Sequence, residues 1–269
     1  MKTRAITGFF FIIVMLASVL LGHYVFGAFY LVLSLLCLRE FYSLIAQTGI
    51  APNQSAGMVN GLYIYVIFAL ITADDNSSYH KILFLLTLTL SAVFVQELFK
   101  KSAAPFTNIA YTFLGLILII LPFTFFHALA YVQGTFNFHF PLAFLLMLWA
   151  NDTGAYLVGV KFGRTKLFER HSPKKTWEGF IGGVLITIGA ATIISHYFME
   201  LTWQQWASIA VFISVFGTTG DLIESMFKRS INVKDSGGIL PGHGGLLDRF
   251  DGLFLAVPVV YTYLYLISN

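Results

Sequence analysis

Charged residues are scarce in this sequence of 269 residues. Only 11% are Asp, Glu, Lys or Arg, whereas 57% are hydrophobic. A soluble domain carries about 25% charged residues, because its surface must be hydrated. The composition therefore argues against a large soluble protein with an apolar core, and the long apolar runs along the whole chain indicate a membrane protein instead.

Cysteine is almost absent as well. Cys37 is the single one, and it lies inside an apolar run. An intrachain disulfide and a cysteine-rich metal site are therefore excluded, and we interpret Cys37 as a small buried hydrophobic residue.

The apolar runs are long enough for membrane helices, which need about 20 mostly apolar residues, whereas a β-barrel would show short alternating strands. We predict an all-α, polytopic integral membrane protein with about nine transmembrane helices. No clear small-residue cleavage site follows the first run, so we interpret it as a retained anchor. The predicted spans are residues 5–21, 27–45, 57–73, 82–99, 106–124, 141–160, 178–198, 204–222 and 250–267.

Positive charge is distributed unevenly between the two ends of these spans. If the N-terminus is cytoplasmic, fifteen of the 16 Lys and Arg residues fall on the cytoplasmic side and only Lys81 falls outside. Cytoplasmic loops of membrane proteins carry such an excess of Lys and Arg. We therefore predict a cytoplasmic N-terminus, and we expect the basic face to attract anionic headgroups or nucleotides.

The role of the polar residues changes near residue 150. Residues 1–140 predict generic helices that act as a scaffold, where Arg39, Glu40 and Glu97 lie near cytoplasmic helix ends and are explained by snorkelling or mutual pairing. For residues 141–269 we predict a catalytic transmembrane region with cytoplasmic loops.

Asn151 and Asp152 lie in the middle of the sixth predicted span. An ionisable group at that depth is costly and usually faces a bundle interior or a wet cavity. Asp152 shares a helical face with Tyr156, four residues later. We favour a functional role over a structural polar contact between helices.

The segment "SPKKTWEG" (172–179) follows in the next cytoplasmic loop. Ser172 as cap and Pro173 in the first turn predict the start of a helix, which would place Lys174 and Lys175 beside its positive end as an anion site. A basic anchor at the membrane interface is the alternative. The glycines at 179, 182 and 183 are interpreted as close-packing positions.

The eighth predicted span ends in "GTTGDLIESMFKRS" (217–230). Asp221, Glu224, Ser225 and Lys228 recur at helical spacing, so one face carries all four. An intrahelical pair explains Glu224 and Lys228, but it does not explain Asp221, which lies deeper in the apolar segment.

The most polar stretch is "KDSGGILPGHGGLLDRFDG" (234–252). Its glycines can bring backbone N–H groups close to an anion, although P-loop and Rossmann spacing is lacking. Asp248 and Asp251 share a helical face, and with Asp221 they give three carboxylates that would repel one another without a cation. Oxygen ligands near basic residues suit Mg²⁺ and phosphates, and hence phosphoryl or nucleotidyl transfer to a lipid headgroup.

The run 225–252 closely resembles the signature of the phosphatidate cytidylyltransferases, and "SPKKTWEG" and "ND" followed by "GAYLVG" resemble the same family. The likeness covers about residues 150–255. The matching signature positions are Ser225, Lys228, Arg229, Lys234, Asp235, Gly237, Pro241, His243, Gly244, Gly245, Asp248, Arg249 and Asp251.

The resemblance implies that CTP and phosphatidic acid give CDP-diacylglycerol and pyrophosphate, with Mg²⁺ required and room for a potassium ion. It also implies a homodimer in the inner (plasma) membrane, with the active site facing the cytoplasm and no nucleic-acid partner. Asp221, Asp248 and Asp251 would hold the metal, and Lys228 and Arg249 would join them as catalytic residues. The implied substrate-binding residues are Asp152, Lys174, Lys175, Ser225, Arg229, Lys234 and His243.

Three alternatives remain at this point. A polyprenol-type kinase that uses CTP would move the γ-phosphate instead of the cytidylyl group. An ion-coupled transporter would use the intramembrane aspartates, but we find no inverted repeat in the sequence. An inactive relative that only binds its ligands is disfavoured by the intact aspartates.

Overall fold

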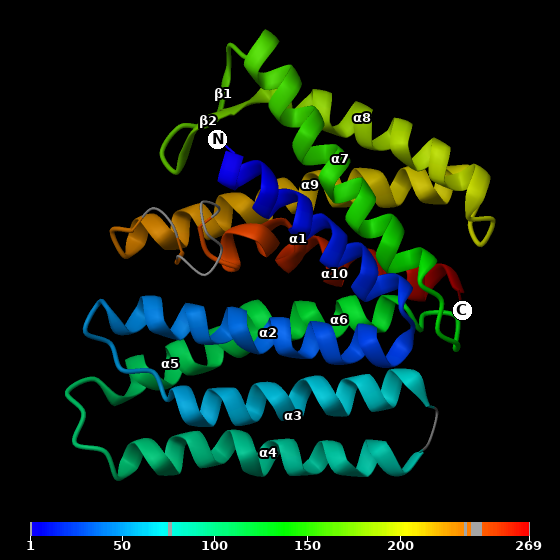
Figure 1. Cartoon of the computed structure of the whole chain (residues 1–269). Helices are drawn as coiled ribbons and strands as arrows, with labels where there is room; N and C mark the ends of the chain where they lie inside the picture. Colours follow the sequence, from blue (N-terminus) through cyan, green and yellow to red (C-terminus); the bar gives the residue numbers. More distant parts are fainter. Residues whose placement is uncertain (1, 75–76, 234–235, 238–243, 269) are drawn as a thin grey trace. The chain divides into compact units, whose positions relative to one another are not determined.

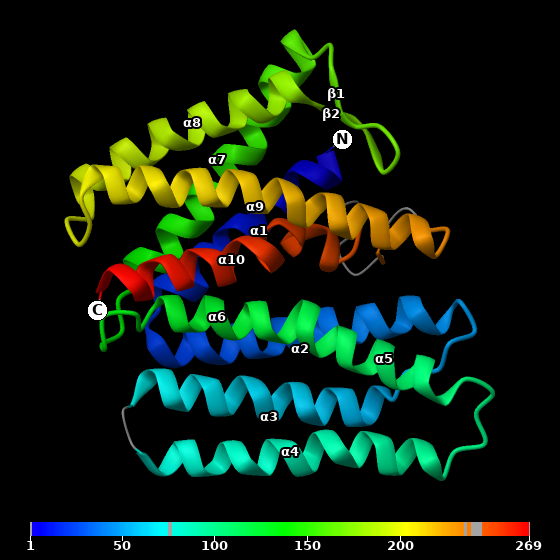
Figure 2. The same cartoon turned by 180° about the vertical axis from the view of Figure 1, so that it is seen from behind.

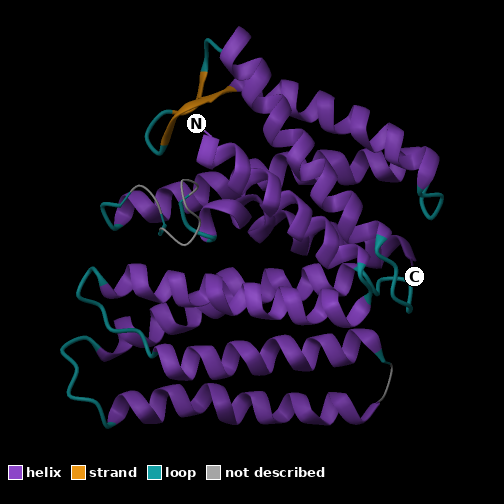
Figure 3. Ribbon diagram, in the orientation of Figure 1, coloured by secondary structure: helices purple, strands orange, loops and turns teal. Residues whose placement is uncertain are grey.

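The computed structural model describes residues 2–74, 77–233, 236–237 and 244–268. These residues form helices almost throughout, with one short β-hairpin (Figure 3). They divide into two compact units. The first comprises residues 1–136 with 235–248, and the second comprises 137–234 with 249–269.

The first unit is a stack of helices that lie side by side (Figure 1). Pro122 cannot donate a backbone hydrogen bond, and a π-turn, η1, precedes it within an otherwise continuous rod. The helices are α1 (Lys2–Leu20), α2 (His23–Ala46), α3 (Gln54–Ala73), α4 (Ser77–Leu98), α5 (Pro105–Gly115), η1 (Leu116–Ile120) and α6 (Leu121–Leu129).

The core of this unit combines aromatic packing with polar links between helices. Phe26, Tyr30 and Phe126 pack as a fully buried group between α2 and α6. Tyr42 of α2 donates a 2.7 Å hydrogen bond to the carbonyl of Thr112 on α5. Such links bind the helices to one another where lipid offers no hydrogen-bonding partner.

The second unit holds α7, α8 and α9, which pack in sequence (Figure 2). Its elements are α7 (His139–Phe162), β1 (Lys166–Phe168), β2 (Ser172–Thr176), α8 (Trp177–Tyr197), α9 (Trp203–Ser230) and, from Arg249 onward, α10 (Leu247–Ser268).

Small residues bring α7 and α8 close together, as the glycines of the sequence predicted. A Cβ atom at Gly182 would lie 2.5 Å from the side chain of Val158, and one at Gly154 would lie 3.3 Å from the Cα atom of Gly183. Close backbone approach of this kind is typical of membrane helix pairs.

The all-α, polytopic membrane fold is confirmed. Eight helices in the described part of the chain are long and apolar enough to cross a membrane, and they match the second to ninth predicted spans. The first predicted span overlaps α1, whose apolar part, Thr7–Leu20, is shorter. The number of spans and the cytoplasmic N-terminus stay predictions.

The predicted helix start at Ser172 is wrong. Residues 172–176 form strand β2, which pairs antiparallel with β1, and the helix begins only at Trp177. The N-cap is Thr176, whose hydroxyl accepts a 3.2 Å hydrogen bond from the Gly179 amide. Because β1 supplies backbone partners for the segment, Pro173 lies in a strand instead of a first helical turn.

Candidate active site

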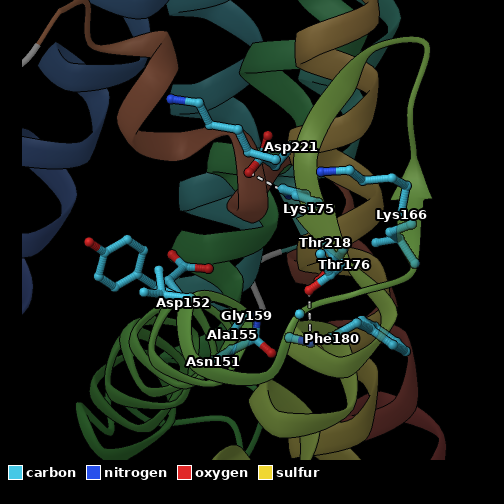
Figure 4. A pocket seen from close by; sticks show the side chains of 16 residues that line it. Asn151, Asp152, Ala155, Gly159, Lys166, Lys175, Thr176, Phe180, Thr218 and Asp221 are labelled. Carbon is cyan, nitrogen blue, oxygen red and sulfur yellow. Dashed lines mark hydrogen bonds and ion pairs between the residues drawn. The ribbon is translucent and has the colours of Figure 1, made fainter.

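A cavity of about 550 Å³ lies in the second unit, among α7, the β-hairpin, α8 and α9 (Figure 4). Apolar side chains such as Val160 and Phe180 form part of its wall. Charged side chains reach it from three elements: Asp152 from α7, Lys166, Lys174 and Lys175 from the hairpin, and Asp221 from α9.

Helix α7 contributes the polar pair that the sequence singled out. Asn151 is buried, with 2% of its surface exposed, while Asp152 is exposed to the cavity. Tyr156 lines the same cavity one turn later, which confirms the predicted shared face. The carboxyl group at mid-helix therefore faces a cavity that also receives charged side chains from the hairpin and α9.

Helix α9 carries the predicted stripe of four polar side chains on one continuous helix. Lys175 of the hairpin places its Nζ atom 2.5 Å from Asp221 Oδ2, and the Ser225 hydroxyl donates to Asp221 Oδ1 at 3.3 Å. One turn further on, Glu224 and Lys228 form a buried ion pair at 2.5 Å.

The hairpin is tied to α8 by its backbone. The Glu178 carboxylate accepts hydrogen bonds from the Arg164 amide at 3.0 Å and from the Thr165 amide at 3.1 Å. The Trp177 amide donates to the Thr165 carbonyl at 2.9 Å. These contacts hold the residues before β1 against the start of α8, and β1 pairs with β2, the strand that carries Lys174 and Lys175.

Asp251 of α10 joins the acidic residues of the second unit. It lies within electrostatic range of Asp221, Glu224 and Asp152. The helices approach closely here, because a Cβ atom at Gly220 would overlap the Asp251 carbonyl oxygen. The glycine before Asp221 therefore lets α9 and α10 bring two aspartates together.

The acidic residues of the second unit are candidate ligands for a divalent cation. In the described ranges, no three Asp, Glu, His or Cys side chains converge closely enough to hold a metal as they stand. Their chemistry nevertheless fits Mg²⁺, since carboxylate oxygens are its preferred protein ligands. Asp152, Asp221, Glu224 and Asp251 repel one another, and ion pairs link Asp221 to Lys175 and Glu224 to Lys228. A divalent cation would relieve the repulsion that remains.

Asp248 belongs to the first unit, where it lies in the first turn of α10. Its carboxylate accepts hydrogen bonds from the Ser236 amide at 3.1 Å and from the Gly245 amide at 3.0 Å. The glycine-rich segment was predicted to bring N–H groups to an anion. Among the described residues, the anions that its amides bind are carboxylates of the protein itself.

Glu40 of α2 contacts this segment, although its sequence pattern did not predict such a contact. The Glu40 carboxylate of α2 accepts hydrogen bonds from the Leu246 and Leu247 amides at 2.7 and 3.0 Å. Snorkelling and mutual pairing were the predicted explanations, and neither describes these contacts. The signal available in the sequence was a carboxylate near the end of an apolar helix, on the side of the membrane where the glycine-rich loop was also predicted to lie.

Other predicted site residues take different positions. Arg229 is exposed and donates to the Val233 carbonyl at 3.3 Å, and Arg249 is exposed at the start of α10. Lys234 and His243 lie outside the described residues. Lys166 and Thr218 line the cavity without having been predicted to do so.

Comparison with known proteins agrees with this architecture. The family model described as "Cytidylyltransferase family" matches residues 2–267. The chain is 32% identical over 277 residues to a phosphatidate cytidylyltransferase of Bacillus subtilis (strain 168), covering 100% of this chain and 99% of the relative. It is also 33% identical over 262 residues to one of Staphylococcus aureus (strain COL) and 32% identical to one of Staphylococcus haemolyticus (strain JCSC1435), with 97% of each chain covered.

The chain therefore belongs to the cytidylyltransferase family, and it is a multi-pass membrane enzyme of the nucleotidyltransferase class. Within that class it groups with the phosphatidate cytidylyltransferases, as the signature resemblance indicated.

Proposed function

We propose that the protein transfers the cytidylyl group of CTP to phosphatidic acid, giving CDP-diacylglycerol and pyrophosphate. The observation that carries the proposal is the cavity in which Asp221 and Lys175 form an ion pair beside Asp152, with apolar side chains in the same wall. Such a cavity offers charge for a triphosphate and a phosphate headgroup, and apolar surface for the lipid that bears the headgroup.

In the proposed reaction, a phosphate oxygen of phosphatidic acid attacks the α-phosphorus of CTP. A new P–O bond forms there, and the bond from the α-phosphorus to the bridging oxygen breaks, so that pyrophosphate leaves with the electron pair. Because the attacking oxygen is already anionic, no side chain has to act as a strong general base. Positioning and charge neutralisation carry the catalysis.

The basic and the acidic side chains have different roles in this reaction. Lys166, Lys174 and Lys175 offer ammonium groups to the phosphate oxygens of both substrates, and the hairpin holds them in place. Asp221 would hold Mg²⁺ in the cavity, and the family resemblance assigns Asp248 and Asp251 to the same metal. When bound, Mg²⁺ would supply positive charge to the reacting phosphates. A K⁺ ion beside the Mg²⁺ and a homodimeric assembly rest on the family resemblance alone.

The proposed location is the inner (plasma) membrane, with the cavity open to the cytoplasm. The asymmetric distribution of Lys and Arg supports this orientation, and CTP is a cytoplasmic substrate.

The test uses the purified protein in nanodiscs with phosphatidic acid, Mg²⁺ and CTP labelled in either the α- or the γ-phosphate. A cytidylyltransferase puts the α-label into lipid and the γ-label into pyrophosphate. A lipid kinase would put the γ-label into lipid, and that result would overturn the proposal. Asp221→Asn is the control: we expect it to insert normally and to lose at least about 1,000-fold in kcat, as expected for loss of a catalytic electrostatic contact.

A further inference from the structure

Glu40 is a buried carboxylate of α2 that does not line the cavity. Only 6% of its surface is exposed, and its neighbours on the helix, Cys37 and Phe41, are fully buried. Burial of a charged group is costly unless hydrogen bonds compensate for the lost water. The hydrogen-bonding partners of Glu40 therefore indicate its role.

Within the described part of the chain, the hydrogen bonds of the Glu40 carboxylate go to the signature segment. One oxygen, Oε2, accepts from the Leu246 and Leu247 amides, and the other, Oε1, accepts from the Ser236 hydroxyl at 3.3 Å. Leu247 is the first residue of α10, and the first N–H groups of a helix have no partner within it. Glu40 supplies that partner and places negative charge at the positive end of the helix.

Two signature glycines make room for this carboxylate. A Cβ atom at Gly237 or at Gly245 would overlap Glu40 Oε1. Any other residue at either position would push the carboxylate away from the amides. The close contact with Glu40 therefore explains why residues 237 and 245 are glycines.

Ser236 connects Glu40 to Asp248. The Ser236 hydroxyl donates to Glu40, while the Ser236 amide donates to the Asp248 carboxylate. The Gly245 amide precedes the Leu246 amide that Glu40 binds. It donates to Asp248 Oδ2, the oxygen that also accepts from the Ser236 amide at 3.1 Å. A change at Glu40 therefore reaches the Asp248 carboxylate through the Ser236 and Gly245 amides.

We propose that Glu40 is a positioning residue of the transferase, which holds residues 244–248 so that Asp248 keeps one orientation. The inference rests on the proposed function, because the motif assigns Asp248 to the metal centre. Glu40 itself touches neither substrate nor metal in this proposal. It acts through the backbone that carries Asp248.

Three variants and one control test the proposal. Glu40→Ala removes all the hydrogen bonds, Glu40→Asp shortens the reach, and Glu40→Gln keeps an oxygen that can accept from both amides. Glu97→Gln is the matched control, because Glu97 is also a buried carboxylate of the first unit, 2% exposed, but pairs with Lys100 and Asn108.

We expect Glu40→Ala to lower kcat by about 100-fold while the KM for CTP changes by less than about 3-fold, as for a displaced catalytic group. Glu40→Asp should lose nearly as much, whereas Glu40→Gln should recover to within about 10-fold of wild type. Glu97→Gln should stay within about 3-fold. If Glu40→Ala keeps the wild-type kcat, or raises KM alone, the positioning role is wrong.

Amide hydrogen exchange in nanodiscs gives a readout that does not depend on turnover. Peptides covering 244–250 should exchange faster in Glu40→Ala than in wild type and in Glu97→Gln, while peptides of α3 stay unchanged. Unchanged exchange at 244–250 would overturn the proposal, and so would a general increase across the first unit, because either result shows that Glu40 does not act on this segment. A wild-type protein that fails to label lipid would instead overturn the proposed function, while the exchange result would still show whether Glu40 orders the segment.

Discussion

At the scale of single residues, the two neighbouring lysines of the hairpin differ in their surroundings. The Lys175 side chain is 26% exposed and forms an ion pair with Asp221, whereas Lys174 is exposed at the cavity wall. Both lysines line the cavity, but only Lys175 is held by an ion pair with Asp221. The pair "KK" therefore combines one fixed ammonium group with one that remains in contact with solvent.

We predict that Lys175→Met lowers kcat by about 100-fold, because it removes a fixed positive charge next to the reacting phosphates. Lys174→Met should mainly raise the KM for CTP, by less than about 10-fold. It removes a contact that binds the substrate and the transition state equally well. Steady-state kinetics on both variants decide between them, with the apparent Tm as a check on folding. Equal losses of kcat would show that the ion pair with Asp221 gives Lys175 no special role.

The sequence predicted which residues of the second unit would share a helical face, but it did not predict Glu40. Helical spacing placed Asp152 with Tyr156, and Asp221 with Glu224, because periodicity follows from local geometry. The contact of Glu40 with Leu247 spans 207 positions, and no local pattern encodes it. Thr176 was missed for a different reason: Ser172 and Pro173 satisfy the rules for a helix start, and strand pairing with β1 outweighs them.

At the scale of secondary-structure elements, α7 and α8 depend on a close backbone contact that only glycine permits. We predict that Gly182→Ala destabilises the protein by about 1–3 kcal/mol, because the added methyl group meets Val158 in a filled space. Gly189→Ala is the matched control on the same helix. Nothing lies within 4 Å of its added methyl group, and alanine favours the helix by up to about 1 kcal/mol.

Thermal unfolding in detergent should therefore lower the apparent Tm for Gly182→Ala and leave it equal or higher for Gly189→Ala. A similar decrease for both variants would mean that glycine serves the flexibility of α8 and not its packing against α7.

The connection between α8 and α9 is fixed to the start of α7 by Glu200. Its carboxylate accepts a 2.9 Å hydrogen bond from Asn137 and pairs with His139, whose ring stacks on Phe198 at 4.0 Å. Partial burial raises the pKa of Glu200, but the contacts with Asn137 and His139 outweigh it and leave the pKa below its ordinary value of 4.5.

A lowered carboxyl pKa stabilises the folded state above pH 4.5, and this stabilisation disappears as the pH falls through the folded-state pKa. We predict that wild type has a higher apparent Tm than Glu200→Gln at pH 6, and that the difference shrinks when the pH is lowered below 4.5. A difference that stays constant down to pH 3 would show that the ionisation of Glu200 contributes nothing.

At the scale of the whole molecule, the uneven distribution of Lys and Arg predicts the orientation in the membrane. The buried Cys37 should give little background in labelling experiments, which makes single-cysteine additions practical. We predict that a membrane-impermeant maleimide labels Thr135→Cys in intact cells but labels Lys101→Cys only after lysis. The reverse pattern would place the basic loops outside and separate the cavity from cytoplasmic CTP.

The contact between Glu40 and α10 also has a consequence for biosynthesis. Ribosomes add about 5–20 residues per second, so Leu247 follows Glu40 by on the order of 10–40 seconds. During that interval, α2 enters the bilayer with a carboxyl group whose amide partners have not yet been made. Chains truncated after residue 233 should therefore be degraded faster in pulse-chase experiments than the same truncation with Glu40→Leu, and equal lifetimes would contradict this. The second helix of the nascent chain would reach its final, fully bonded state only when translation is nearly complete.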